Sequence, residues 1–319
     1  MLTSRVSTFG QADVLLNALL QTQNNLAQAQ QQVSTGDKST TYEGLSPNVS
    51  TLAGAQSTAS QTQNYLNTNA AISNTLSAYD TALTGLSSIA SSLKDAVTQA
   101  VANNSGTGLI TTIKGLLSQA VDLLNQKVNG SYIFGGTNTT TAPVSVTTAS
   151  GLIALAAPAT PLTAPTGAFA NNQLKAEAQV DSNLTVTYGQ LASAVGGPLM
   201  AEIQSILQYD AGVTTGGSSF GTTLTAAQSA FLTGEVGNLN QVSQGVNQAT
   251  AANGVVQQEL ATLQQTQNSR LTAANNFISD IANADVATAV THVNEDQLAL
   301  QASYNLIASM SKLTILNYI

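Results

Sequence analysis

Residues 9–33 read FGQADVLLNALLQTQNNLAQAQQQV, and residues 286–307 near the other end read VATAVTHVNEDQLALQASYNLI. Both stretches repeat apolar residues in steps of three and four, the spacing that keeps one face of a helix against a partner helix. Chain ends are usually the least ordered part of a domain. We therefore predict that the terminal helices form the functional interaction surface, paired with each other or with neighbouring subunits. The candidate interface residues are Phe9, Leu16, Leu19, Leu26 and Val33 in the first helix, and Val293, Leu300, Tyr304, Ile307, Leu313 and Leu316 in the last.

The composition between these ends is polar but nearly uncharged. Charged residues make up 8% of the chain, against roughly 25% in an ordinary globular domain. Hydrophobic residues reach 43% over 319 residues, which is enough to bury a core. The net charge is −8, with only eight Lys and Arg in the whole sequence. No basic patch can form to neutralise phosphates, so nucleic acid is not an expected partner.

Cysteine is absent, which excludes disulfide frameworks and thiolate chemistry. The first ten residues contain no apolar segment or cleavage site typical of a signal peptide, and no run of about 18 apolar residues occurs. We therefore expect neither a cleaved signal peptide nor membrane insertion. Taken alone, these features favour the cytoplasm.

Helical periodicity continues through most of the chain. A loop is expected over 34–47, where Gly36, Gly44 and Pro47 interrupt the pattern. Helices are predicted over 49–103, 109–128, 199–209 and 225–277, and Asp285 suits the start of the last helix.

A β-rich segment interrupts the helices. The run 131–136 is aromatic and β-branched, and strand-like stretches follow at 174–180 and 184–188. The predicted fold class is therefore mainly α: a long antiparallel helical bundle, with N- and C-terminal helices paired as a coiled coil, plus a small inserted β-rich domain. The predicted domains are an inner coiled-coil domain (1–40 and 285–319), a helical bundle (41–136 and 199–284) and an outer insert (137–198).

The sequence offers few residues suited to catalysis. His292 is the only histidine, and without cysteine it cannot complete a metal set or a Cys-His pair. Gly135-Gly136 and Gly216-Gly217 lack the surroundings of a phosphate-binding loop and are interpreted as turns. We expect no enzyme activity, no cofactor and no metal site.

Two questions stay open on the sequence. Gln23, Gln30 and Gln297 on the predicted seams either are tolerated polar positions or fix register and partner number. The aromatic run 132–134 is either ordinary core or an intersubunit contact, with core favoured.

Three segments together resemble the flagellin superfamily, and most closely its hook-associated protein 3 group, the hook–filament junction proteins. They are VSTGDK at 33–38, YIFGGT at 132–137 with TAP at 141–143, and LQASY at 300–304 followed by LTILNY at 313–318. The resemblance implies an inner coiled coil of terminal helices, a second helical bundle and an outward insert. It also implies unfolded export through the flagellar type III channel with an export chaperone, and a place in the extracellular flagellum.

The resemblance leads to a structural junction protein as the expected function. Its expected partners are copies of itself, flagellin and another hook-associated protein. The alternative is a filament-forming flagellin. A secreted enzyme or binding protein on a helical stalk is a third, less favoured reading, because the insert holds only Lys175, Glu177 and Asp181 as charged residues.

Overall fold

The structure, a computed structural model, describes residues 3–46, 48–158 and 160–316, with side chains except those of 3–9, 11–12 and 310–316. The chain is mainly α-helical, as predicted. Its helices and strands are α1 (Thr3–Thr35), the 3-10 helix η1 (Glu43–Leu45), α2 (Val49–Ala102), α3 (Leu109–Leu124), β1 (Lys127–Val128), β2 (Ser131–Tyr132), α4 (Ala149–Ala154), β3 (Glu177–Asp181), β4 (Leu184–Thr187), α5 (Ala192–Val195), α6 (Gly197–Asp210), α7 (Ala226–Ala282) and α8 (Val286–Leu316).

The chain divides into two compact units. A terminal unit combines Met1–Gln63 with Asn268–Ile319, and a central unit comprises Asn64–Gln267. The predicted division into three domains draws different boundaries and stays a prediction. Within the described residues, no helix is both long and apolar enough to cross a membrane.

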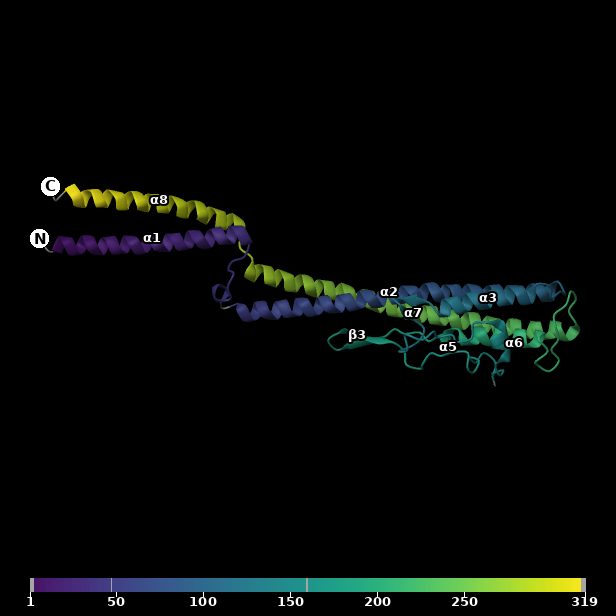
Figure 1. Ribbon diagram of the computed structural model, residues 1–319. Helices are drawn as coiled ribbons and strands as arrows, with labels where there is room; N and C mark the ends of the chain where they lie inside the picture. The colour runs from purple at the N-terminus through teal and green to yellow at the C-terminus, as the bar shows by residue number, and fades with distance from the viewer. Residues whose placement is uncertain (1–2, 47, 159, 317–319) are drawn as a thin grey trace. The chain divides into compact units, whose positions relative to one another are not determined.

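In the terminal unit α1 and α8 lie side by side and antiparallel, with the two ends of the chain at the same end of the pair (Figure 1). Gly36, at φ +77°, ends α1 in a conformation that favours glycine. Two backbone hydrogen bonds then join the connections at the base of the pair. The N–H of Lys38 donates to Ala282 O at 2.7 Å, and the N–H of Ala284 donates to Gly36 O at 2.7 Å.

The start of α8 is capped as the sequence predicts. One carboxylate oxygen of Asp285 accepts hydrogen bonds from the N–H groups of Ala287 (3.0 Å) and Thr288 (3.2 Å), and the other accepts the Thr288 hydroxyl (2.9 Å). These bonds lower the pKa of Asp285, with the Thr288 side chain as the largest cause. A carboxylate here satisfies N–H groups that have no partner within the helix.

The central unit is built on α2 and α7, which run antiparallel. Polar contacts fix the direction, because Asn69 meets Gln267 near one end while Ser87 meets Asn247 further along. The predicted apolar run of α2 is buried in this unit, and α3 adds its own apolar face. The buried members on α2 are Ile72, Leu76, Tyr79, Leu83, Leu86, Ala90, Leu93 and Val97. At about 25 cal/mol per Å² of apolar surface, such a row is the main source of stability.

Buried amides set the register of this packing. Asn69 Nδ2 donates to Val180 O at 3.4 Å, and Gln267 Nε2 donates to the same oxygen at 2.7 Å. Asn69 Nδ2 also donates to Gln267 Oε1 at 2.7 Å. Further along, Asn253 and Gln257 both donate to Leu76 O. Shifting either helix would leave these buried groups unpaired, which is costly.

One helix is shorter in the structure than the sequence predicts. The helix expected over 109–128 ends at Leu124, and residues 127–132 form the β1–β2 hairpin. Asn129 (φ 50°) and Gly130 (φ 81°) both adopt positive φ, as a two-residue hairpin turn requires. The Asn-Gly pair that follows the predicted helix is therefore the turn of a hairpin and not a helix stop.

The insert holds less regular β structure than its composition suggests. The β3–β4 hairpin confirms the predicted strands around residues 181–183. The segment also contains the short helices α4 and α5, the isolated bridge between Val144 and Phe169, and one from Leu191 to Gly135. On α6, Gln204 and Gln208 donate to backbone carbonyls at the end of α4, among them Leu155 O at 3.0 and 2.8 Å. In Figure 1, β3, α5 and α6 gather along one side of α7.

The aromatic run 132–134 contributes to the core, as favoured. Phe134 is fully buried, and its ring lies edge-on to that of Tyr79 with centroids 5.0 Å apart. The Tyr79 hydroxyl donates to Ile133 O, and burial raises the pKa of Tyr79 to about 12. This bond ties the segment after β2 to α2.

Replacing Tyr79 with Phe tests that bond. We expect Tyr79→Phe to keep the fold but to lower the free energy of unfolding by about 1–3 kcal/mol, because the carbonyl of Ile133 stays buried without its donor. Urea denaturation followed by circular dichroism measures the change. Tyr42→Phe is the matched control, since Tyr42 is 65% exposed. Equal stability of the Tyr79→Phe and wild-type chains would show that the bond contributes nothing.

Candidate assembly interface

The contact between α1 and α8 is an apolar seam made partly of small residues. Leu19, Ala29, Ala289 and Leu300 are buried along it. Leu26 and Val293 are half-buried beside them. The α8 members 289, 293 and 300 follow steps of four and seven, so they fall on one face of the helix. The seam therefore holds the pair together through few large side chains, each worth roughly 1.5–3 kcal/mol when fully buried.

A second apolar face of each helix stays exposed next to this seam. We call this exposed face the flank. Each of its residues lies one, three or four positions along the sequence from a buried residue of the seam. Its described members are Leu16 and Leu20 on α1, and Val286, Val290 and Tyr304 on α8, all between 42% and 51% exposed. Exposed apolar rows of this kind mark interaction surfaces more often than isolated apolar residues do.

The structure thus distributes the predicted interface residues over two faces. Of the eleven, Leu19 and Leu300 are buried in the seam, and Leu26 and Val293 border it. Four others are exposed, and they are Leu16, Val33, Tyr304 and Ile307. The side chains of Phe9, Leu313 and Leu316 lie outside the described residues. A stripe that covers more than one face of a straight helix explains the split, since one partner helix can bury only part of it.

The sequence reading missed several exposed apolar side chains. Val14 is 71% exposed, Leu298 is 66% exposed and Leu306 is 50% exposed. These residues lie off the single apolar stripe that the periodicity predicts. A second stripe, offset from the first in the same sequence, is the signal from which they could have been predicted.

The glutamines of the predicted seams are all exposed in the chain. Gln23 crosses from α1 to α8, where its Nε2 donates to the Tyr304 hydroxyl at 2.9 Å. Tyr304 therefore combines an exposed ring with a hydroxyl held by the opposite helix. Buried amides do fix register in this protein, but they lie on α2 and α7.

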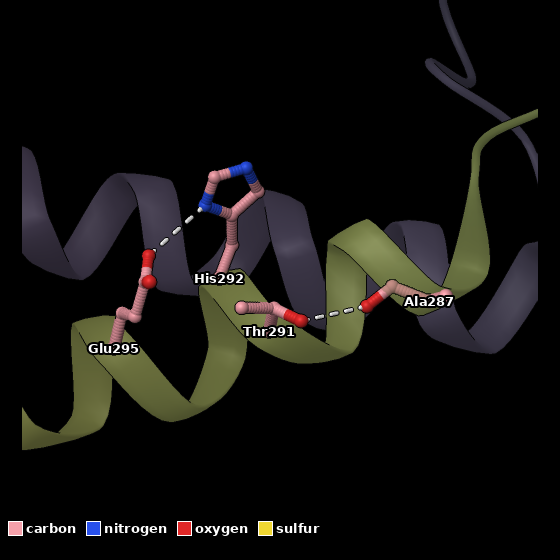
Figure 2. Close-up of polar contacts among 4 residues, drawn as sticks. All are labelled: Ala287, Thr291, His292 and Glu295. Carbon is pink, nitrogen blue, oxygen red and sulfur yellow. Dashed lines mark hydrogen bonds and ion pairs between the residues drawn. The ribbon is translucent and has the colours of Figure 1, made fainter.

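His292 lies on the exposed side of α8. Figure 2 shows its ring and the Glu295 carboxylate reaching toward each other from successive turns, with Nδ1 3.5 Å from Oε2. The Thr291 hydroxyl donates to Ala287 O at 2.9 Å in the same view. Within the part of the chain that the structure describes, no three His, Cys, Asp or Glu side chains are placed to hold a metal ion.

A polar groove lies between α1 and α8 beside His292. Its volume is about 450 Å³, and the two seam alanines contribute to its wall. The remaining lining residues are polar or charged apart from Ala284, and they are Asn25, Gln28, Gln32, Lys38, Asp285, Thr288, His292 and Asp296. Lys38 Nζ donates to Asp280 O and Asp285 caps α8, so two of these charges already have structural roles.

Comparisons with known proteins agree with this architecture. No protein-family model matches the sequence, and no curated protein matches it. Among solved structures, the chain is similar to a protein from Vibrio parahaemolyticus assigned as a flagellar hook-associated protein, with a TM-score of 0.56 and 17% identity, over 73% of this chain and 96% of that one. It is also similar to FlgL from Bacillus cereus, with a TM-score of 0.52 and 14% identity, over 70% of this chain and 96% of that one.

These likenesses define the class of fold. The chain has the mainly helical fold found in flagellar hook-associated proteins, and its helices α1 and α8 pair with each other. At 14–17% identity the likeness concerns the fold, and the sequences have diverged widely.

The seam can be tested in the isolated chain. Leu300→Asp places a charge in the contact between α1 and α8 and removes a buried leucine, a loss of roughly 2–5 kcal/mol. We expect lower helicity and faster proteolysis at both ends, with the central unit intact. Leu298→Asp is the matched control, because it adds the same charge on the same helix where the side chain is 66% exposed. Identical proteolysis of the two variants would contradict the seam.

Proposed function

We propose that this protein is a structural component of the bacterial flagellum, a junction protein that connects hook-associated proteins to the flagellin filament. The exposed flank on the paired terminal helices is the observation that carries the proposal. A monomeric protein gains nothing from apolar rows at both chain ends, whereas an assembled subunit buries them. The likeness in fold to two flagellar proteins supports the same reading.

The terminal unit suits a subunit that becomes stable on assembly. Its seam includes two alanines among the buried positions, and only 8% of the whole chain is charged. Ion pairs between helices therefore contribute little, and long helices with sparse packing depend on tertiary contacts for stability. Neighbouring copies, flagellin on one side and another hook-associated protein on the other are the partners that would cover the flank.

Location and export follow from the same proposal. The protein would lie outside the cell in the flagellum, after unfolded export through the flagellar type III channel with the help of a chaperone. The absence of cysteine and the low charge suit a chain that must unfold, travel and refold. A filament-forming flagellin is the alternative, since it would use the same pairing of terminal helices.

The flank is tested by a charge on its exposed face. We expect Leu16→Asp to leave the monomer's circular dichroism unchanged, because Leu16 is 50% exposed, and to prevent assembly and motility. Asn17→Asp is the control, since it adds the same charge one residue along on a different face of α1. Normal motility of cells carrying Leu16→Asp would count against a flank that contacts neighbouring subunits.

Polymer growth distinguishes a junction protein from a filament-forming flagellin. A filament subunit regenerates its own binding surface and polymerises without limit, whereas a junction subunit must match unlike proteins on its two sides. We expect purified protein added to filament fragments to form at most a thin cap, visible by electron microscopy, on which separate flagellin then polymerises. In a deletion strain we expect hooks without filaments and flagellin monomer in the medium. Sustained self-polymerisation would assign the chain to the flagellins instead.

A further inference from the structure

An acidic pair is buried in a part of the central unit that lacks basic residues. From residue 128 to residue 269 the sequence has a single basic side chain, Lys175. Three of the acidic side chains in this stretch are buried, Asp181 on β3 and the pair considered below, Glu202 on α6 (2% exposed) and Glu235 on α7 (6% exposed). Carboxylates in such surroundings are normally paired with a cation. It is therefore necessary to ask which group neutralises the charge of these two carboxyls.

The hydrogen bonds around the pair satisfy one carboxyl better than the other. Both oxygens of Glu235 accept bonds from neutral donors, the Ser205 hydroxyl at 2.7 Å and Asn238 Nδ2 at 2.8 Å. Glu202 lines the same cavity as Glu235, and its Oε2 is buried with no hydrogen-bond partner. Two neighbouring carboxyls can bond to each other only if one of them carries a proton. Glu202 is therefore the carboxyl that gains a bond when a proton is present.

The described surroundings offer nothing else to compensate a second charge. The pair lines a cavity of about 200 Å³ between α6 and α7, whose wall also includes Ala157, Pro158, Pro161, Leu162 and Thr214. Among the described residues that line it, there is no Lys, Arg or His and no other acidic group. Lys114 and Asp122 on α3, which packs against α6, are both exposed to solvent. Burial, then the hydrogen bond and the charge of Glu235, raise the pKa of Glu202 to about 9.

The helix that carries Glu202 also holds the outer segment of the insert. Gln204 Nε2 donates to Leu152 O and Leu155 O, and Gln208 Nε2 donates to Ile153 O and Leu155 O. Any separation of α6 from α7 would therefore move α4 as well. The carboxyl pair lies at the contact between this block and α7.

We propose that Glu202 and Glu235 form a proton-operated latch that holds α6, and the α4 segment bound to it, against α7. With the proton present, the two carboxyls bond to each other and the block is closed. Without it, two buried carboxylates repel each other with no cation to offset them, and the block loosens. The latch makes the outer part of the protein responsive to alkaline conditions, independently of how the terminal helices assemble.

The sign of the pH dependence follows from the raised pKa. An unfolded or opened Glu202 loses its proton near pH 4.5, whereas the closed form keeps it until about pH 9. The stabilisation is therefore complete below pH 4.5 and is lost progressively as the pH rises toward 9. With one proton linked to opening, the protection of α6 amides should fall roughly tenfold per pH unit across this window.

Hydrogen exchange of the full chain, corrected for the intrinsic effect of pH, tests the latch. We expect wild-type α6 and residues 149–156 to lose protection with rising pH, while the α2 core does not. Glu202→Gln keeps a donor toward Glu235 but cannot ionise, so its protection should be independent of pH. Glu259→Gln is the control, because Glu259 is exposed on the same α7 and should retain the wild-type slope.

Two results of the pH series would overturn the latch. One is a wild-type α6 whose protection does not change between pH 5 and pH 9, and the other is a Glu202→Gln variant with the wild-type slope. Should Glu202→Gln fold poorly, Glu235→Gln provides a second route, since removing the neighbouring charge should reduce the slope. A rise in α6 protection on adding Ca²⁺ at pH 8.5 would assign the pair to a cation and contradict a proton-operated latch.

Discussion

The antiparallel packing of α2 on α7 is the interaction on which the central unit depends. Its apolar row supplies most of the burial, and the amides of Asn69, Gln267 and Asn253 permit only one alignment of the two helices. Asn69 and Gln267 also donate to Val180 O, so the contact that sets the helix register also anchors the β3–β4 hairpin. A shift in this contact would therefore disturb the insert as well as the bundle.

Uncharged polar side chains perform the tasks that ions perform in most helical proteins. Glutamines fasten α4 to α6, a glutamine bridges α1 and α8, and many Ser and Thr hydroxyls bond to the carbonyl four residues earlier in their own helix, as Thr58 and Thr250 do. Neutral hydrogen bonds are little affected by salt. Only a few ionisable side chains hold specific positions, among them Lys38 after α1, Asp285 at the start of α8, and Glu202 with Glu235 in the core.

The sequence was sufficient to predict the long helices and the Asp285 cap but less informative about which face meets which partner. Periodicity located α2, α7 and α8 to within a few residues, and Asp285 was correctly placed as a cap. The hairpin at Asn129-Gly130 was misread because the same pair can end a helix or turn a strand. Leu16 and Leu19 share one stripe in the sequence, yet the first is exposed and the second buried, because that depends on where α8 lies. Glu202 gave no signal, since its partner is distant in sequence.

The pairing of the two chain ends also determines the order in which the molecule can fold. Gln23 and Tyr304, which bond across α1 and α8, are 281 residues apart in sequence. Closing so long a loop directly is entropically unfavourable and slow, since its cost grows with the logarithm of loop length. The bonds between Gly36 and Ala284 and between Lys38 and Ala282 shorten the remaining loop to the two helices themselves. The terminal pair is therefore expected to form last, leaving α1 and α8 apart while the rest of the chain is already folded.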